Sequence, residues 1–132
     1  MIIDIIIIFM INLEDRMTNK KFEELVEEQF TICNQLLCNK SQEYDFGKDR
    51  LHSFKVAAEL LKTTPEEALL GYLTKHIMSI YDMIPEVNNF SFDKFMEKIT
   101  DTINYLLLLK GLLYERKIDN SCKGIDAKDE TN

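Results

Sequence analysis

The stretch Thr-Thr-Pro-Glu-Glu at residues 63–67 marks where one long helix begins. Thr64 can cap the helix, Pro65 suits its first position, and Glu67 stands where a capping box needs a carboxylate. The predicted helix runs to about Met83, because the next proline ends it. Its buried stripe is expected from apolar residues at helical spacing: Leu69, Leu73, Ile77, Ile80 and Ile84.

A second long helix is predicted downstream, after a loop over residues 85–92. Ser91 or Asp93 can cap this helix, which is expected to reach about Arg116. Its second half, residues 105–114, reads Tyr-Leu-Leu-Leu-Leu-Lys-Gly-Leu-Leu-Tyr and is apolar nearly all round. Such a helix is either central in the fold or lies at a subunit interface.

Upstream, residues 20–38 predict an amphipathic helix, because apolar residues recur at steps of three and four. Residues 39–48 collect polar side chains and Gly47, and predict an irregular crossing. Asp49 can cap a further helix. The inward face of that helix is expected from Leu51, Phe54, Val56, Ala57, Leu60 and Leu61.

The composition agrees with a helical protein. The 132 residues are 45% hydrophobic and include 4 Gly, 2 Pro and no Trp, which favours long helices and excludes a sandwich or barrel. We therefore predict an all-α, four-helix bundle-like single domain that forms an oligomer. It divides into an apolar N-terminal extension (1–16), the helical domain (17–117) and a disordered polar tail (118–132).

The first eleven residues, Met-Ile-Ile-Asp-Ile-Ile-Ile-Ile-Phe-Met-Ile, are apolar but too short to span a membrane. They carry Asp4 and lack the basic start and cleavage site of a signal peptide. We therefore expect no membrane partner. Two alternatives remain for this stretch: translation begins at Met17, or the stretch is a short strand or an apolar extension that covers another surface.

The net charge and the cysteine content exclude some classes of partner and site. Lys and Arg number 16 against 23 Asp and Glu, a net charge of −7, which argues against duplex nucleic acid as a partner. Cys33, Cys38 and Cys122 form an odd set without a CxxC pair, so neither a disulfide framework nor a four-ligand zinc site is predicted. A reducing, cytoplasmic location fits best.

Polar residues at helical spacing on otherwise apolar segments are the candidate site. Glu97, Asp101 and Asn104 share one face of the last helix, and Lys75, Ser79 and Asp82 share one face of the preceding helix, with His76 beside them. Two carboxylates one turn apart need a partner when they are buried. That partner is either Lys75 or a divalent metal, for which Mg²⁺ or Mn²⁺ suits the oxygen ligands.

Further ligands can come from the irregular crossing. Glu43, Asp45 or Asp49 can add a carboxylate, and Lys48, Arg50 or Lys75 can bind phosphate oxygens. The alternative interpretation is structural. Glu97 and Asp101 then belong to a solvated helix face or to ion pairs with Lys94, Lys98 or Lys75, and His76 is a packed or hydrogen-bonded histidine.

Several of these segments also resemble a known family. They are Lys40-Ser41-Gln42-Glu43-Tyr44, Asp49-Arg50-Leu51-His52-Ser53-Phe54, Lys75-His76 with Ser79 and Asp82, Glu97-Lys98-Ile99-Thr100-Asp101, and Ile103-Asn104-Tyr105. Residues 40–114 are similar to the nucleotide modification associated domain proteins of the first type, small phage and prophage proteins. These look like distant relatives of the all-α, MazG-like nucleoside triphosphate pyrophosphohydrolases.

The resemblance implies a four-helix, Mg²⁺-dependent fold that handles nucleotides as a dimer or tetramer. Its helix carboxylates carry over to Glu97 and Asp101. MazG-like enzymes commonly combine ExxE with ExxD, whereas the pair here is ExxxD, so Asp82 or Glu43 would have to complete the metal site.

The leading hypothesis is a phage-type protein that hydrolyses a (deoxy)nucleoside triphosphate to the monophosphate and pyrophosphate. Glu97 and Asp101, with Asp82 or Glu43, would hold Mg²⁺; Lys75 and Arg50 would bind phosphates. Tyr44, Asn104 and His76 would contact the nucleotide or orient ligands. A second hypothesis is a nucleotide-binding module without hydrolysis. A third is a helical oligomerisation or adaptor protein that binds neither nucleotide nor metal.

Overall fold

The computed structural model describes residues 1–14, 16–43 and 49–129; side chains are described at all of these except 11–14, 39–43, 122 and 124–129. In chain order the elements are α1 (Ile2–Glu14), α2 (Asn19–Glu43), α3 (His52–Leu61), α4 (Pro65–Met83), the 3₁₀ helix η1 (Ile84–Asn89) and α5 (Phe92–Asp129). Strands are absent from these described ranges, which confirms the predicted all-α class.

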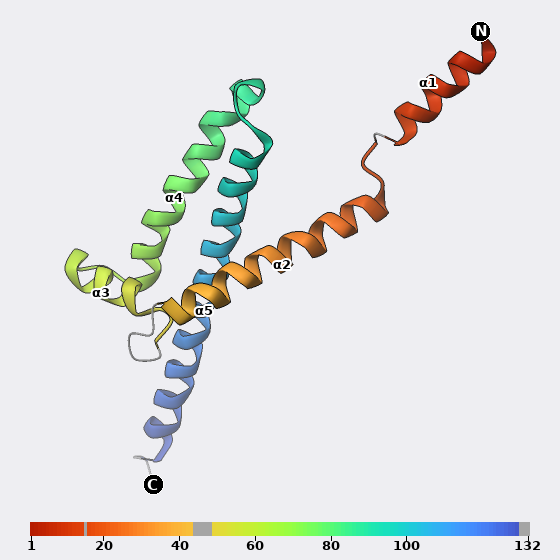
Figure 1. The fold of residues 1–132 in the computed structure, drawn as a ribbon. Helices are drawn as coiled ribbons and strands as arrows, with labels where there is room; N and C mark the ends of the chain where they lie inside the picture. The colour runs from red at the N-terminus through yellow and green to blue at the C-terminus, as the bar shows by residue number, and fades with distance from the viewer. Residues whose placement is uncertain (15, 44–48, 130–132) are drawn as a thin grey trace.

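The centre of the fold is an antiparallel pair of helices, α4 and α5, joined by η1 (Figure 1). We call this pair the α4–α5 hairpin. The Thr64 hydroxyl accepts from the Glu67 N–H at 3.2 Å, and the Glu67 carboxylate accepts from the Thr64 N–H at 3.0 Å. Pro65 occupies the first turn and α4 ends at Met83, so both predicted ends of this helix are confirmed.

Helix α5 begins as expected and runs further than expected. The Ser91 hydroxyl accepts from the Lys94 N–H at 3.2 Å and so caps its start. The predicted end near Arg116 is corrected by the structure, which continues α5 to Asp129 and so through most of the predicted disordered tail, while residues 130–132 lie outside the described residues (Figure 1). The stretch lacks proline, and its Lys and Asp residues stand at spacings that a helix tolerates, so polarity alone did not end the helix.

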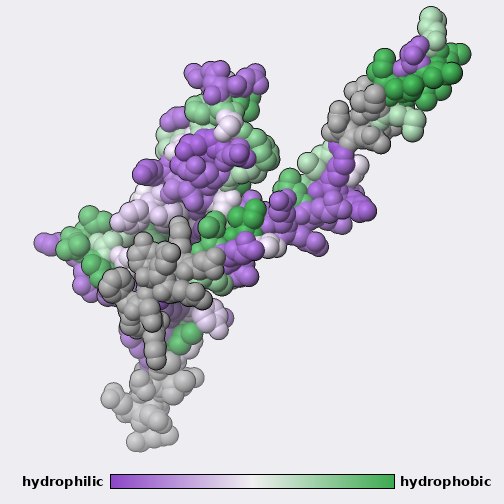
Figure 2. Space-filling view, viewed as in Figure 1, coloured by the Kyte–Doolittle hydropathy of each residue, from purple (hydrophilic) through white to green (hydrophobic). Residues whose placement is uncertain are grey.

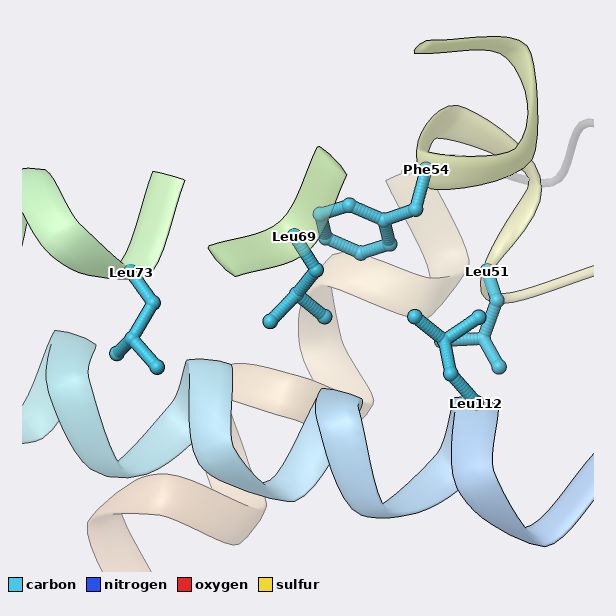
Figure 3. Close-up of a cluster of buried hydrophobic side chains, with 5 residues drawn as sticks. All are labelled: Leu51, Phe54, Leu69, Leu73 and Leu112. Carbon is cyan, nitrogen blue, oxygen red and sulfur yellow. The ribbon is translucent and has the colours of Figure 1, made fainter. Parts of the chain in front are cut away.

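The hydrophobic core lies between α3, α4 and α5. Its buried side chains are Leu51, Phe54, Leu69, Leu73 and Leu112 (Figure 3). The partly buried Tyr105, Leu108 and Leu109 pack against them. Only one side of the leucine run in α5 therefore packs into the core. Two other members of that run, Leu106 and Leu113, stay exposed.

Helix α2 crosses α5 rather than lying along the hairpin (Figure 1). It continues to Glu43, so the predicted irregular crossing begins later than residue 39, and residues 44–48 lie outside the described residues. Asp49 does not cap α3 directly. Its Oδ1 accepts from the Leu51 N–H at 2.9 Å, and α3 begins at His52.

Helix α1 forms from the isoleucine-rich stretch, which is helical rather than a short strand. A helix satisfies its backbone groups internally, whereas a strand needs a partner edge. Side chains 1–10 are all exposed, and α1 packs against no other described helix. Within the described residues, no helix combines the length and apolar character that crossing a membrane requires.

Candidate functional site

His76 of α4 and Asp101 of α5 meet across the hairpin. The distance from His76 Nδ1 to Asp101 Oδ2 is 3.4 Å, and the side chains are 16% and 34% exposed. The two polar stripes predicted from spacing thus come together, but at His76 rather than at Lys75. Both side chains are partly buried, so this pair lies at the rim of the helix interface.

Aromatic rings surround this pair. Tyr105 lies at the centre: its ring centroid is 5.0 Å from His76, 6.4 Å from Tyr72 at an interplanar angle of 9°, and 6.3 Å from Phe54 at 73°. Burial raises the pKa of Tyr105, and the neighbouring Asp101 carboxylate adds to the rise. The Tyr105 hydroxyl therefore stays protonated at neutral pH and can donate a hydrogen bond.

The aromatic members were not predicted as site residues. Tyr72 and His76 stand four residues apart on α4, and Asp101 and Tyr105 stand four apart on α5. This repeated spacing places each pair on one helix face. Taken together with the predicted contact between the two helices, it could have identified the cluster from the sequence.

Asn104 adds an unsatisfied acceptor to the same part of α5. Its Oδ1 is buried and receives no hydrogen bond from the described residues. Leaving a buried acceptor unpaired costs about 1–3 kcal/mol. A donor supplied by water or by a ligand would remove that cost, which makes Asn104 the strongest of the predicted substrate-binding residues.

Glu97 lies at the outer edge of this face. Its carboxylate forms ion pairs with Lys94 and Lys98, each at 3.1 Å, and it is exposed. Hydrogen bonding to Lys98, followed by Lys94, holds the pKa of Glu97 below its usual value. Glu97 thus adopts the ion-pair arrangement that was the alternative to a metal ligand, and Asp101 has a different partner.

The remaining predicted residues are spread out. Lys75 is exposed, and Asp101 pairs with His76 rather than with the Lys75 ammonium. The Ser79 hydroxyl donates to the Lys75 backbone carbonyl at 3.0 Å. Asp82 is exposed near the end of α4, and Arg50 is exposed just before α3. These positions leave Lys75 and Arg50 accessible to phosphate.

Of the carboxylates predicted from the crossing segment, Glu43 and Asp45 lie outside the described side chains, whereas Asp49 is described. Glu43 is the last residue of α2 and its side chain is outside the described residues, as is all of Tyr44. In the part of the chain where side chains are described, no three His, Cys, Asp or Glu residues gather as a metal site. The described side chains of a single chain therefore do not by themselves gather three such ligands, and the predicted Mg²⁺ site, which can include Glu43, stays a prediction.

Other charged residues form ion pairs between helices. Lys55 bridges Asp49 and Glu115, each at 2.9 Å, and Arg116 holds Glu66 through two bonds of 2.6 and 2.8 Å. Lys55 lowers the pKa of Asp49 through a hydrogen bond, and Arg116 does the same for Glu66. These ion pairs join α3 and α4 to α5, which is a structural role.

The chemistry available at the α4–α5 face is therefore recognition by flat rings and directed polar groups. We call the set Tyr72, His76, Asp101, Asn104 and Tyr105 the aromatic–acid cluster. Stacking surfaces, a carboxylate, an imidazole and an amide can recognise a heterocycle with donor groups.

Comparisons with known proteins add nothing to this geometry. No family model matches the chain, and neither a curated protein nor a solved structure matches it.

Proposed function

We propose that the protein binds a nucleotide at the aromatic–acid cluster on the α4–α5 hairpin. The observation that carries this proposal is the meeting of His76 and Asp101 beside Tyr105, on a helix that also carries the unpaired buried Oδ1 of Asn104. Stacked rings bind bases of any sequence, while an amide and a carboxylate discriminate among donor patterns.

The exposed member of the cluster is the expected contact for the base. Tyr72 is half exposed, whereas Phe54, against its edge, is buried in the core. Stacking a base on an aromatic side chain contributes about 1–3 kcal/mol. Lys75 is exposed three residues after Tyr72 and is available for a phosphate oxygen. The base and phosphate contacts would thus come from the same helix.

Hydrolysis is the finer part of the proposal and follows from the family resemblance. In that reaction water adds to the α-phosphorus, the bond to the bridging oxygen breaks, and pyrophosphate leaves. Bound Mg²⁺ would neutralise phosphate charge. Because the described residues of one chain do not gather a metal site, no catalytic step is assigned to Glu97, Asp82 or Glu43. A place in phage nucleotide metabolism and a cytoplasmic location belong to the same proposal.

Thermal unfolding with a panel of ribo- and deoxynucleotides, with and without Mg²⁺, tests binding. A ligand at 100 times its Kd adds about 2.7 kcal/mol of stability, which corresponds to several degrees. Tyr72→Leu is expected to remove the shift. Tyr81→Leu is the matched control, because Tyr81 is exposed on the same helix outside the cluster. Pyrophosphate release, measured on every nucleotide that binds, separates an enzyme from a binding module.

An assembly module is the second candidate, and the exposed apolar surface supports it. Ile77, Ile80, Tyr81, Ile84 and Pro85 line an open groove of about 440 Å³. Glu97 is held in ion pairs, as that candidate requires. This function predicts no thermal shift with any nucleotide or with Mg²⁺. A homo-oligomer, dimer or tetramer, is compatible with both candidates.

A further inference from the structure

Helix α2 carries two apolar seams, and α5 covers only one of them. The covered seam contains Val26, Gln29, Cys33 and Leu37, of which Cys33 is fully buried. The Gln29 amide donates to the Thr100 hydroxyl of α5 at 2.9 Å and to Cys33 Sγ at 3.3 Å. This seam accounts for how α2 is held in the protomer.

The second seam lies beside the covered one and remains exposed. It contains Phe22, Leu25, Ile32 and Leu36, whose side chains are between 37% and 55% exposed. Phe22, Leu25, Ile32 and Leu36 are separated by three, seven and four residues, so they lie along one side of α2, next to the side that carries Gln29. We call this set the outer seam of α2. It has the pattern of a helix that lacks its partner helix.

Helix α1 extends the same projecting arm. Figure 2 shows its hydrophobic residues uncovered at the far end of the molecule. Nine residues from Met1 to Met10 are large and apolar, each at least half exposed or close to it, on all sides of the helix. A helix that is apolar all round is a buried helix in the assembled state.

The amount of exposed surface shows that the chain is far from compact. The accessible surface of the chain is 11151 Å². A folded monomer of 15.5 kDa is expected to expose about 7,200 Å². The excess of about 4,000 Å² is a property of the whole chain, to which the arm contributes, and it is larger than the roughly 800 Å² that each partner buries in a stable interface. A second protein chain can cover surface on this scale, whereas a small ligand cannot.

Charge indicates which macromolecule fits. Glu23, Glu24, Glu27 and Glu28 lie on the polar side of α2 beside the outer seam, and a negative face is repelled by anionic lipid headgroups. A lipid-bound helix also keeps a polar face toward water, which α1 lacks. Both features disfavour a membrane surface as the partner.

We propose that α1 and the outer seam of α2 form an interface with a second copy of this chain. An antiparallel pairing of α2 sets Phe22 near the partner's Leu36 and Leu25 near the partner's Ile32. The glutamates then lie opposite the uncharged segment around Thr31 to Gln35 of the partner subunit. A parallel pairing would instead set the glutamates of both chains side by side, which is unfavourable.

Light scattering coupled to gel filtration tests this interface with the full chain. The wild type is expected to have twice the protomer mass or more, and Leu25→Glu/Ile32→Glu is expected to fall to the protomer mass. Leu60→Glu is the matched control, because Leu60 is exposed on α3 away from the arm. A monomeric wild type, or an outer-seam variant with the wild-type mass, would overturn the proposal.

Two measurements on the wild type test the interface even if the outer-seam variant fails to fold. Amide exchange over residues 19–36 should slow as protein concentration rises, while exchange in α4 stays unchanged. Concentration-independent exchange over 19–36 refutes the interface. A monomer that floats with phosphatidylcholine vesicles also refutes it and identifies lipid as the partner. Neither outcome depends on nucleotide binding, so the proposed function is tested separately.

Discussion

Replacing Asp101 by Asn separates a ligand-binding carboxylate from a structural ion pair. In the structure Asp101 Oδ2 lies 3.4 Å from His76 Nδ1 and is partly exposed. When His76 is protonated, opposite charges at that distance attract by about 1 kcal/mol in water, and measured values for exposed pairs are about 0.2–1 kcal/mol. Lys75 is exposed, so Asp101→Asn leaves no buried ammonium unpaired, and a loss of ~3 kcal/mol or more is not expected.

The ligand-free variant should therefore lose at most about 1 kcal/mol, or roughly 3 °C in melting temperature for a chain of this size. A nucleotide at 100 times its Kd should raise the free energy of unfolding of the wild type by about 2.7 kcal/mol and should not raise that of the variant. The difference in stability between the two proteins should therefore grow by that amount. The measurement is thermal unfolding of both proteins with and without nucleotide and Mg²⁺. Asp119→Asn, an exposed change on the same helix, should match the wild type.

A third readout comes from Tyr105. Burial raises the pKa of Tyr105 above 10.0, and the Asp101 carboxylate adds to that rise. Asp101→Asn should lower the Tyr105 pKa while burial keeps it elevated, as measured by tyrosinate absorbance. The reasoning fails if Asp101→Asn keeps the full nucleotide shift, or if the wild type shows no shift with any nucleotide in either metal condition.

Three further changes test the fold. Leu112→Ala should destabilise the protomer by about 2–5 kcal/mol in denaturant unfolding, because Leu112 is in the core; an unchanged midpoint would contradict its burial. Thr64→Ala should cost about 1 kcal/mol by losing the capping box with Glu67, and equal stability by the same assay would exclude that cap. Lys55 holds the pKa of Asp49 below 3.8, so Asp49 contributes stability at neutral pH that is lost as pH falls through its folded pKa. Asp49→Asn should therefore be less stable than wild type at pH 7 and equal to it in strong acid; a gap that persists in acid would refute this.

Features set by neighbouring residues could be predicted from the sequence. The start of α4 follows from Thr64 and Glu67, which act through backbone groups three residues away, and its end follows from the proline at 85. The cap at Ser91 is of the same kind. Each depends on contacts within one helical turn, so the sequence contains all that determines it.

Features set by tertiary packing could not be predicted from the sequence. Leu60 and Leu61 were expected on the inward face of α3, yet both are exposed, because α3 ends at Leu61 and Lys62 adopts a left-handed conformation. Likewise, spacing placed Asp101 opposite α4 but did not show whether Lys75 or His76 would meet it. That choice depends on the rotation of one helix against the other, which a single helix pattern leaves undetermined.

The antiparallel arrangement of α4 and α5 also has a kinetic consequence. The two helices are consecutive in the chain and joined only by η1 and a short link, so their contacts close a small loop. Folds rich in such local contacts form within microseconds to milliseconds. The bond from Gln29 to Thr100 instead joins residues 71 positions apart, and closing that loop costs more entropy. We expect the hairpin to form first and α2 to dock on it later, so His76, Asp101 and Tyr105 come together before the chain has finished folding.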